Sequence, residues 1–155
     1  MIRNILVPTD FSAASRDAYR QARELAAAHG ARLHVLHVVA NTVAPNVYTE
    51  LYVPPRSEYF EGLEAAARTR LEEWVPAEDR VPFRMTEAVK LGVPAEEILQ
   101  RIDEDPKIDM VVMATHGRRG VARLMLGSVA ERVLRAARCP VVTVKEAPES
   151  AVRAA

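Results

Sequence analysis

The feature that most constrains this chain is a regular alternation of short aliphatic runs with segments of helical periodicity. The aliphatic runs have the length and composition of strands and cover residues 2–7, 33–39, 108–113 and 141–144. Residues 82–91 are predicted to form a further strand, the third along the chain, and their mixed polarity indicates a place nearer a sheet edge. Alternation of this kind favours a parallel sheet with helices packed on both of its faces. We therefore expect an α/β fold: a single doubly wound domain with a five-stranded parallel sheet.

The helical segments between these runs carry recognisable start and stop signals. Asp10 and Ser12 are both suited to cap a helix N-terminus, and Gly30 is suited to end the helix that follows. A second helix is expected from about Ser57 to Trp74, a third begins at Pro94, and a fourth runs from about Ser128 to Ala137. Residues 40–57 contain three prolines without clear periodicity and are predicted to form a loop.

Composition narrows the class of protein. A chain of 155 residues with 49% apolar residues fits one domain, which we assign to residues 1–145, with a flexible tail at 146–155. Twenty-one basic and 21 acidic residues leave no basic excess, which argues against a nucleic-acid partner. The single cysteine excludes an internal disulfide and agrees with a reducing compartment. With no leader-like segment and no apolar run of about 18 residues, a cytoplasmic protein without a membrane partner is expected.

Two unusual loops follow the carboxyl ends of predicted strands, where doubly wound sheets bind their ligands. Pro8-Thr9-Asp10 follows the first strand, and residues 114–120 follow the fourth. The two loops meet in one crevice if the first and fourth strands are neighbours, which requires the strand order 3-2-1-4-5. A flavodoxin-like order would instead place the third strand beside the first, and that strand ends in the less promising residues 91–93.

The second loop leads to Gly127-Ser128, which opens the last helix. Glycine permits close approach of the backbone, and a helix N-terminus offers free N–H groups to an anion. Positive charge on the intervening segment comes from Arg118, Arg119 and Arg123. Taken singly, these features also fit a simple turn and cap, a solvated charged face, and an Asp10 that only caps the first helix. The pairing of the two loops favours binding of an anion, with a phosphate chain as the first candidate.

Other phosphate and metal motifs are missing from the sequence. It contains no Gly-Lys pair, which excludes a Walker A loop, and no G-x-G-x-x-G after the first strand. The four histidines are scattered, and His34 and His37 lie three apart on a predicted strand, so that they point to opposite faces. We expect no protein-held metal site. Cys139 is interpreted as a small buried residue, and no catalytic residue is assigned.

Together these segments resemble the universal stress protein family over nearly the whole chain. The resemblance runs from residues 4–12 to residues 139–144 and includes residues 37–39, 92–95 and 109–113. Its most specific part is the ATP-binding pattern of glycine, two residues, glycine, nine residues, then glycine with serine or threonine. Gly117 and Gly127-Ser128 match this pattern, and Ala114 replaces its first glycine.

The resemblance implies a site for ATP, with Mg²⁺ or Mn²⁺ held by the phosphates. Around the adenine it places Pro8, Thr9, Asp10 and Val38, and against the base and ribose it places Met113, Ala114 and Gly117. The phosphates would lie against Gly127, Ser128 and Val129, with Arg118 as a further binding residue. Ala130 stands where some members carry a hydroxyl, which would remove one phosphate contact.

Three functions are compatible with these features. The first is an ATP-binding stress-response sensor or switch that acts on an unknown protein partner. The second is a nucleotide-free dimeric adaptor or chaperone-like stress protein, which the departure at Ala114 would favour. The third, an ATPase, ranks last because no general base is evident, so that hydrolysis would be slow at most.

Two further expectations concern the last strand and the departure from the pattern. The last strand should be a sheet edge that pairs with a second copy through Val141, Val142, Thr143 and Val144, unless the tail covers it. If the family glycine supplies a positive φ, Ala114 costs about 1 kcal/mol in strain and weakens ATP binding about five- to tenfold. If the base or ribose packs on that Cα, the methyl group would clash. We expect the former.

Overall fold

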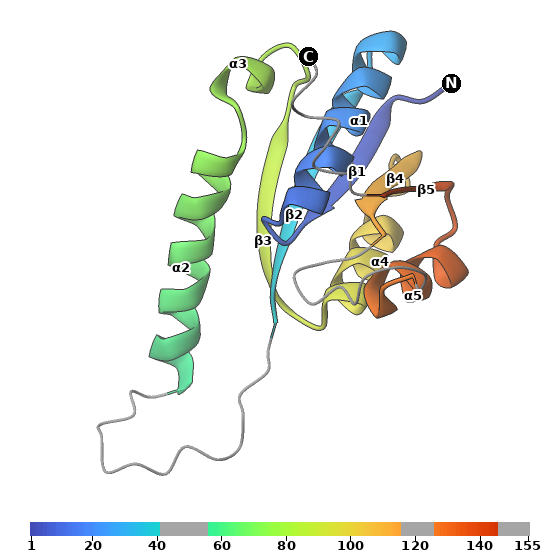
Figure 1. Ribbon diagram of the computed structural model, residues 1–155. Coiled ribbons are helices and arrows are strands. Elements are labelled where there is room, and N and C mark those ends of the chain that lie inside the picture. Colours follow the sequence, from blue (N-terminus) through green and yellow to red (C-terminus); the bar gives the residue numbers. More distant parts are fainter. Residues whose placement is uncertain (41–55, 116–125, 146–155) are drawn as a thin grey trace.

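The structure is a computed structural model that describes residues 1–40, 56–115 and 126–145. Its strands are β1 (Asn4–Thr9), β2 (Arg32–Ala40), β3 (Thr86–Gly92), β4 (Met110–Ala114) and β5 (Val141–Val144). Its helices are α1 (Ala13–His29), α2 (Arg56–Trp74), α3 (Ala77–Arg80), α4 (Pro94–Glu104) and α5 (Ser128–Ala136). All neighbouring strands are parallel, in the order β3-β2-β1-β4-β5, which confirms the predicted order (Figure 1).

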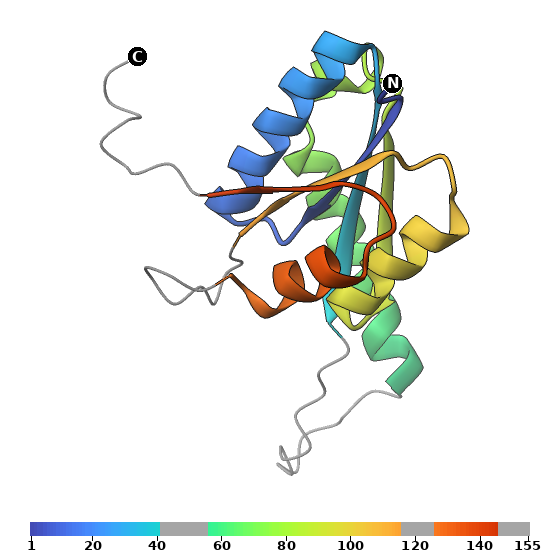
Figure 2. The same ribbon diagram turned by 90° about the vertical axis from the view of Figure 1, so that its right-hand side faces the viewer.

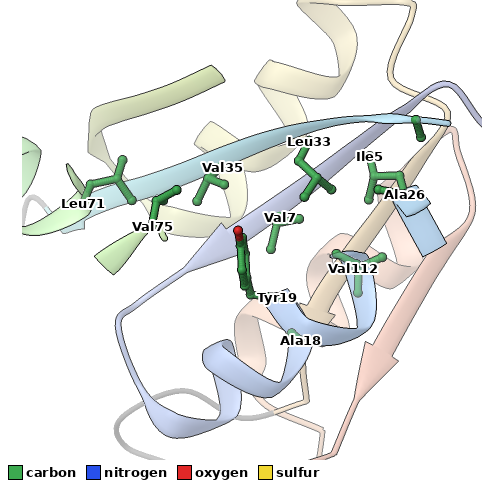
Figure 3. Close-up of a cluster of buried hydrophobic side chains, with 12 residues drawn as sticks. Ile5, Val7, Ala18, Tyr19, Ala26, Leu33, Val35, Leu71, Val75 and Val112 are labelled. Carbon is green, nitrogen blue, oxygen red and sulfur yellow. The ribbon is translucent and has the colours of Figure 1, made fainter. Parts of the chain in front are cut away.

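Two helical layers cover the sheet, because alternate residues of each buried strand point to opposite faces. On one face Ile5 and Val7 of β1 meet Tyr19 of α1 and Leu71 of α2 in a tightly buried cluster (Figure 3). On the other face Leu6 packs with side chains from β2, β4, α4 and α5. Figure 2 shows α4 and α5 on the side of the sheet opposite to α1. The central strands are therefore buried on both faces, as their unbroken aliphatic runs predicted.

β1 extends two residues further than the sequence indicated. We expected the first strand to stop at Pro8, but the strand continues through Pro8 to Thr9. The register between β1 and β4 pairs Ile5 with Met110 and Leu6 with Val111, and Pro8 lies beyond these pairs. The missing N–H of proline therefore falls where β1 has already left its ladder with β4.

The segment before β3 also differs from the prediction. A strand was expected from Pro82, but it begins at Thr86, because α3 and a turn through Arg84 occupy the preceding residues. Arg84 has a positive φ of 43°, which fits a turn and not a strand. The prediction that the third strand lies at a sheet edge is confirmed, as is the prediction that the fifth does.

A buried carboxylate fastens α3 to α1. Asp79 is 2% exposed; one of its oxygens accepts a hydrogen bond from the Tyr19 hydroxyl at 2.7 Å, and the other pairs with Arg23 Nε at 2.9 Å. Burial, followed by this hydrogen bond, raises the pKa of Tyr19 well above its ordinary range. The ring of Tyr19 fills the core while its hydroxyl fixes the chain that enters β3.

None of the helices within the described ranges has the length and apolar character needed to cross a membrane.

Candidate functional site

The turn between β1 and α1 is organised by the Asp10 carboxylate. Its Oδ1 accepts hydrogen bonds from the Ser12 amide at 3.0 Å, from the Ser12 hydroxyl at 2.5 Å and from the buried Ser15 hydroxyl. Ser12 itself is the N-cap of α1, and its hydroxyl accepts from the Ser15 amide at 3.1 Å. Asp10 therefore stands ahead of the cap and adds negative charge where the helix dipole favours it.

Three of the predicted site residues share the face of the sheet that α5 covers. Val38 and Met113 pack with the cluster on the α4–α5 face. Pro8 belongs to the same face by strand alternation, since Leu6 two residues earlier lies in that cluster. Because β1 lies between β2 and β4, these three side chains follow one another across the carboxyl ends of adjacent strands. They form an apolar strip next to the first turn of α5.

The start of α5 is attached to the end of β4. The Gly127 amide donates to the Thr115 carbonyl at 2.8 Å, and the Thr115 amide in turn donates to the Val144 carbonyl of β5 at 2.9 Å. Gly127 is the N-cap residue and has no side chain with which to accept from the following amides. The amides of Ser128 and Val129 belong to the first turn, which has no intrahelical acceptors. An anion placed beyond this helix end would meet them directly.

The side chains at this helix start differ in exposure. Ser128 is exposed, Val129 is half-buried against the α4–α5 cluster, and the methyl group of Ala130 is buried. Gly127 has φ −61° and ψ 147°, a conformation open to any residue. The backbone angles of Gly127 therefore do not require glycine at this position.

The remaining predicted residues divide into two groups. Thr9 and Ala114 lie on the opposite, α1 face: Ala114 packs against the cluster there, and Thr9 shares the alternation of Val7. Gly117 and Arg118 fall outside the described residues, as does most of the loop expected to carry positive charge. The structure thus brings Pro8, Val38 and Met113 to one face and separates them from Thr9 and Ala114.

Ala114 adopts ordinary extended backbone at the end of β4, in register with Val144. Among the described residues other than glycine, positive φ angles occur at Phe11 and Arg84. The strain that we expected at Ala114 is therefore absent, because β4 extends one residue beyond the predicted strand and holds this position in the sheet.

A family model described as the universal stress protein family matches residues 1–145 of the chain.

The chain belongs to the universal stress protein family.

Similar proteins agree with this assignment. The universal stress protein MJ0531 of Methanocaldococcus jannaschii is 35% identical over 150 residues, which span 94% of this chain and 84% of the relative. A universal stress protein of Thermus aquaticus is 35% identical over 149 residues, which span 94% of this chain and all of the relative. The solved structure of the universal stress protein UspA from Lactobacillus plantarum has a TM-score of 0.70 at 26% identity and covers 92% of this chain and 97% of its own.

Two further solved members of the family hold adenine nucleotides. One is a universal stress protein in complex with cAMP, at a TM-score of 0.58 and 24% identity, covering 94% of this chain and 98% of its own. The other is a family member from Arabidopsis thaliana with AMP bound, at a TM-score of 0.61 and 19% identity, covering 96% of this chain and 94% of its own. These two structures share the fold of this chain.

Two residues beside the candidate site were not assigned a role from the sequence. His37 Nδ1 lies 2.8 Å from the Thr9 carbonyl, and the ring of Phe11 stacks on His37 with 4.1 Å between centroids. His34 lies on the other face, where its nitrogens contact Asn4 and Thr86, as the alternation of the strand predicted. The position of His37 in a predicted strand did not indicate that its side chain would contact the turn after β1.

Neither a metal-binding group nor a reactive thiol stands out in the described part of the chain. No three His, Cys, Asp or Glu side chains among those residues are grouped so that they could hold a metal ion. Cys139 is half-buried against the α4–α5 cluster, and burial raises the pKa of its thiol. A thiol with a raised pKa carries little thiolate and is a weak nucleophile at neutral pH.

Proposed function

We propose that this chain is an ATP-binding universal stress protein that acts in the cytoplasm as a sensor or switch on a protein partner. The observation that carries the proposal is the hydrogen bond from the Gly127 amide to the Thr115 carbonyl. It holds the uncapped N-terminus of α5 at the carboxyl end of β4, beside the end of β1. This is the edge at which doubly wound sheets bind nucleotides. The family members that hold cAMP and AMP support an adenine nucleotide as the ligand.

The apolar strip provides a surface for the adenine ring. Pro8 and Val38 are half-buried on the α5 face, Met113 on the same face is buried, and Asp10 lies two residues after Pro8 in the turn. An aromatic base needs such a surface together with a few polar groups at its edge. Asp10 Oδ1 already accepts hydrogen bonds from Ser12 and Ser15. We therefore assign Asp10 the role of shaping the turn beside the ligand.

The phosphates are assigned to the start of α5. The amides of Ser128 and Val129 and the Ser128 hydroxyl would donate to phosphate oxygens, while Gly127 keeps the approach open. The family pattern adds Gly117 and Arg118 to this group. Mg²⁺ or Mn²⁺ would arrive with the phosphates, which supply the oxygen ligands that such cations prefer. No residue is assigned a catalytic role, and ATP hydrolysis is expected to be slow at most.

The first experiment identifies what the protein carries. The purified chain is denatured, and the released small molecules are identified by mass; the proposal expects an adenine nucleotide. Calorimetry then measures ATP affinity for the natural chain, Ser128→Ala, Gly127→Val and the control Thr69→Ala. Thr69 is exposed on α2 and bonds only to the Ala65 carbonyl of its own helix among the contacts described.

The variants have distinct expected outcomes. Loss of one hydrogen bond to a charged group costs about 1.5–3 kcal/mol, so Ser128→Ala should weaken binding about ten- to hundredfold. Gly127→Val should abolish binding by obstructing the approach to the helix end, and Thr69→Ala should have no effect. Unchanged affinity in both Gly127→Val and Ser128→Ala would place the phosphates elsewhere.

We further propose a homodimer through β5. The edge strand β5 consists of Val141, Val142, Thr143 and Val144 and carries no charge. The other edge, β3, carries Glu87 and Lys90, and charged residues are a common means of keeping an edge strand from pairing. Antiparallel pairing of β5 with its copy would satisfy its outer backbone groups. Light scattering at micromolar concentration should give twice the chain mass, and Val142→Lys should give the monomer; a monomeric natural chain contradicts this.

A nucleotide-free dimeric adaptor is the second candidate. It is favoured by Ala114, which departs from the ATP pattern, and by the buried methyl group of Ala130, which cannot donate to a phosphate. Absence of nucleotide after purification, together with no calorimetric response to ATP, AMP or cAMP, would support this alternative.

A further inference from the structure

Phe11, which follows Asp10 in the candidate site, is held in an unfavourable backbone conformation. Its φ is 66°, in the left-handed region that residues with a bulky side chain rarely adopt. Such a conformation persists only where the surrounding contacts impose it. The turn at Asp10 therefore depends on whatever holds the Phe11 side chain.

Two elements hold the Phe11 ring. From β2, the His37 ring stacks on it at 4.1 Å with an interplanar angle of 29°. From α2, the Trp74 ring meets it edge-on at 6.2 Å, and the Arg70 guanidinium lies 4.5 Å from its centroid. Stacked rings and a cation over an aromatic face are both attractive arrangements.

His37 holds both sides of the turn. Its Nδ1 lies 2.8 Å from the Thr9 carbonyl, and because a carbonyl only accepts, Nδ1 carries the proton of this hydrogen bond. The Phe11 amide donates to Thr9 Oγ1 at 3.0 Å. Thr9 and Phe11 are thus both fixed, and Asp10 between them has little freedom to move.

The contact from α2 is itself anchored to α1. The Arg16 guanidinium lies 3.9 Å from the Trp74 ring centroid and donates to the Trp74 carbonyl at 2.7 Å. Tyr19 packs edge-on against the same indole at 5.3 Å. The last turn of α2 is therefore joined to α1 and, through Trp74 and Arg70, to the turn that carries Asp10.

We propose that Phe11 is a positioning residue that holds the Thr9–Asp10 turn in its ligand-ready shape, and that the docking of α2 on Phe11 sets nucleotide affinity. This inference rests on the proposed function. The physical basis is pre-organisation, because a turn that is already fixed loses less conformational entropy when a ligand binds. By linkage, anything that displaces the last turn of α2 weakens nucleotide binding, and bound nucleotide resists that displacement to the same extent.

The test begins without nucleotide. Amide hydrogen exchange is measured for Asp10, Phe11 and Ser12, whose amides all donate within the turn, in the natural chain, Phe11→Leu and Phe11→Tyr. Leucine keeps apolar bulk but loses the flat ring, whereas tyrosine keeps the ring. Exchange of these amides should become about tenfold faster in Phe11→Leu and stay near the natural rate in Phe11→Tyr. The amide of Val7 in β1 serves as the internal reference.

The second measurement is ATP affinity by calorimetry. Phe11→Leu should bind about tenfold more weakly and Phe11→Tyr within about twofold of the natural chain. Arg70→Gln should weaken binding about threefold, whereas the control Arg68→Gln, an exposed residue of the same helix paired with Glu64, should not.

The outcomes separate the two proposals. Unchanged exchange in Phe11→Leu overturns the positioning role, whatever ATP does. Faster exchange with equal ATP affinity in all variants also overturns it, because the turn would then not set affinity. If the natural chain binds no ATP while exchange responds to Phe11→Leu, the proposed function fails and the positioning of the turn stands.

Discussion

Replacement of Ala114 by glycine is expected to restore the family pattern without improving ATP binding. The residue ends β4 in extended backbone, paired in register with Val144, and its methyl group packs against the α1-side cluster. Glycine would relieve no strain at such a position. If Ala114 were strained by about 1 kcal/mol, its replacement by glycine would increase ATP affinity about fivefold. We expect a change of less than about twofold.

The same substitution should lower the stability of the fold. Glycine in a strand costs about 0.5–1 kcal/mol relative to alanine through backbone entropy. Removal of a half-buried methyl group adds a fraction of the roughly 0.8 kcal/mol of a fully buried one. The sum is about 1–1.5 kcal/mol, which corresponds to a melting temperature lower by about 2–6 °C for a domain of this size.

Thermal unfolding followed by circular dichroism and ATP titration by calorimetry test the two halves of this prediction. Ala88→Gly, at a half-buried alanine of β3, is the control and should lose similar stability without touching the site. A fivefold or greater gain in ATP affinity for Ala114→Gly would refute the reasoning. So would binding that appears only in the glycine variant, because the methyl group would then be the obstacle.

Four further substitutions test the rest of the fold by urea unfolding. Tyr19→Phe removes a hydrogen bond to the buried Asp79 carboxylate and should cost about 1.5–3 kcal/mol; a loss below about 0.5 kcal/mol would contradict the arrangement. Burial lowers the pKa of His34, so its contribution to stability should be complete above about pH 6.5 and be lost as the pH falls below that value. A His34→Gln chain should show a flatter acid profile, and identical profiles would count against this. An added Cβ meets nothing within 4 Å at either Gly62 or Gly30, but Gly30 has φ +65°. Gly62→Ala should therefore raise the free energy of unfolding by up to about 1 kcal/mol, and Gly30→Ala should lower it by about as much. Changes of the same sign in both variants would show that the φ angle does not determine the effect of the added methyl group.

The sheet could be predicted because its strands are visible in local sequence and because its strand order follows from the position of two loops. Aliphatic runs identify buried strands directly, and Gly30, the C-cap of α1, is readable from its residue type. The strand order followed from the requirement that the loops after β1 and β4 meet. α3 was missed because four residues are too short to show helical periodicity, and because its anchor, Asp79, binds residues of the distant α1.

For the candidate site, the sequence predicts which strand residues share a face but not the contacts between their side chains. Strand alternation places Pro8 and Met113 on one face once the strand boundaries are known. The extended conformation of Ala114 depends on one additional residue at the end of β4, which is within the ordinary error of boundary prediction. The Phe11 ring contacts side chains of β2 and α2 that lie far from it in the sequence, and no local sequence pattern indicates such contacts.

The side-by-side placement of β1 and β4 joins segments that lie about one hundred residues apart in the sequence, since Ile5 pairs with Met110. No short stretch of the sequence contains both the turn at Asp10 and the helix start at Gly127. A ligand that needs both therefore binds only the completed fold, and its binding free energy adds to the free energy of unfolding. At about one hundred times its dissociation constant the ligand contributes about 2.7 kcal/mol. A rise in melting temperature with ligand concentration would then show that the ligand binds the folded chain in preference to the unfolded one.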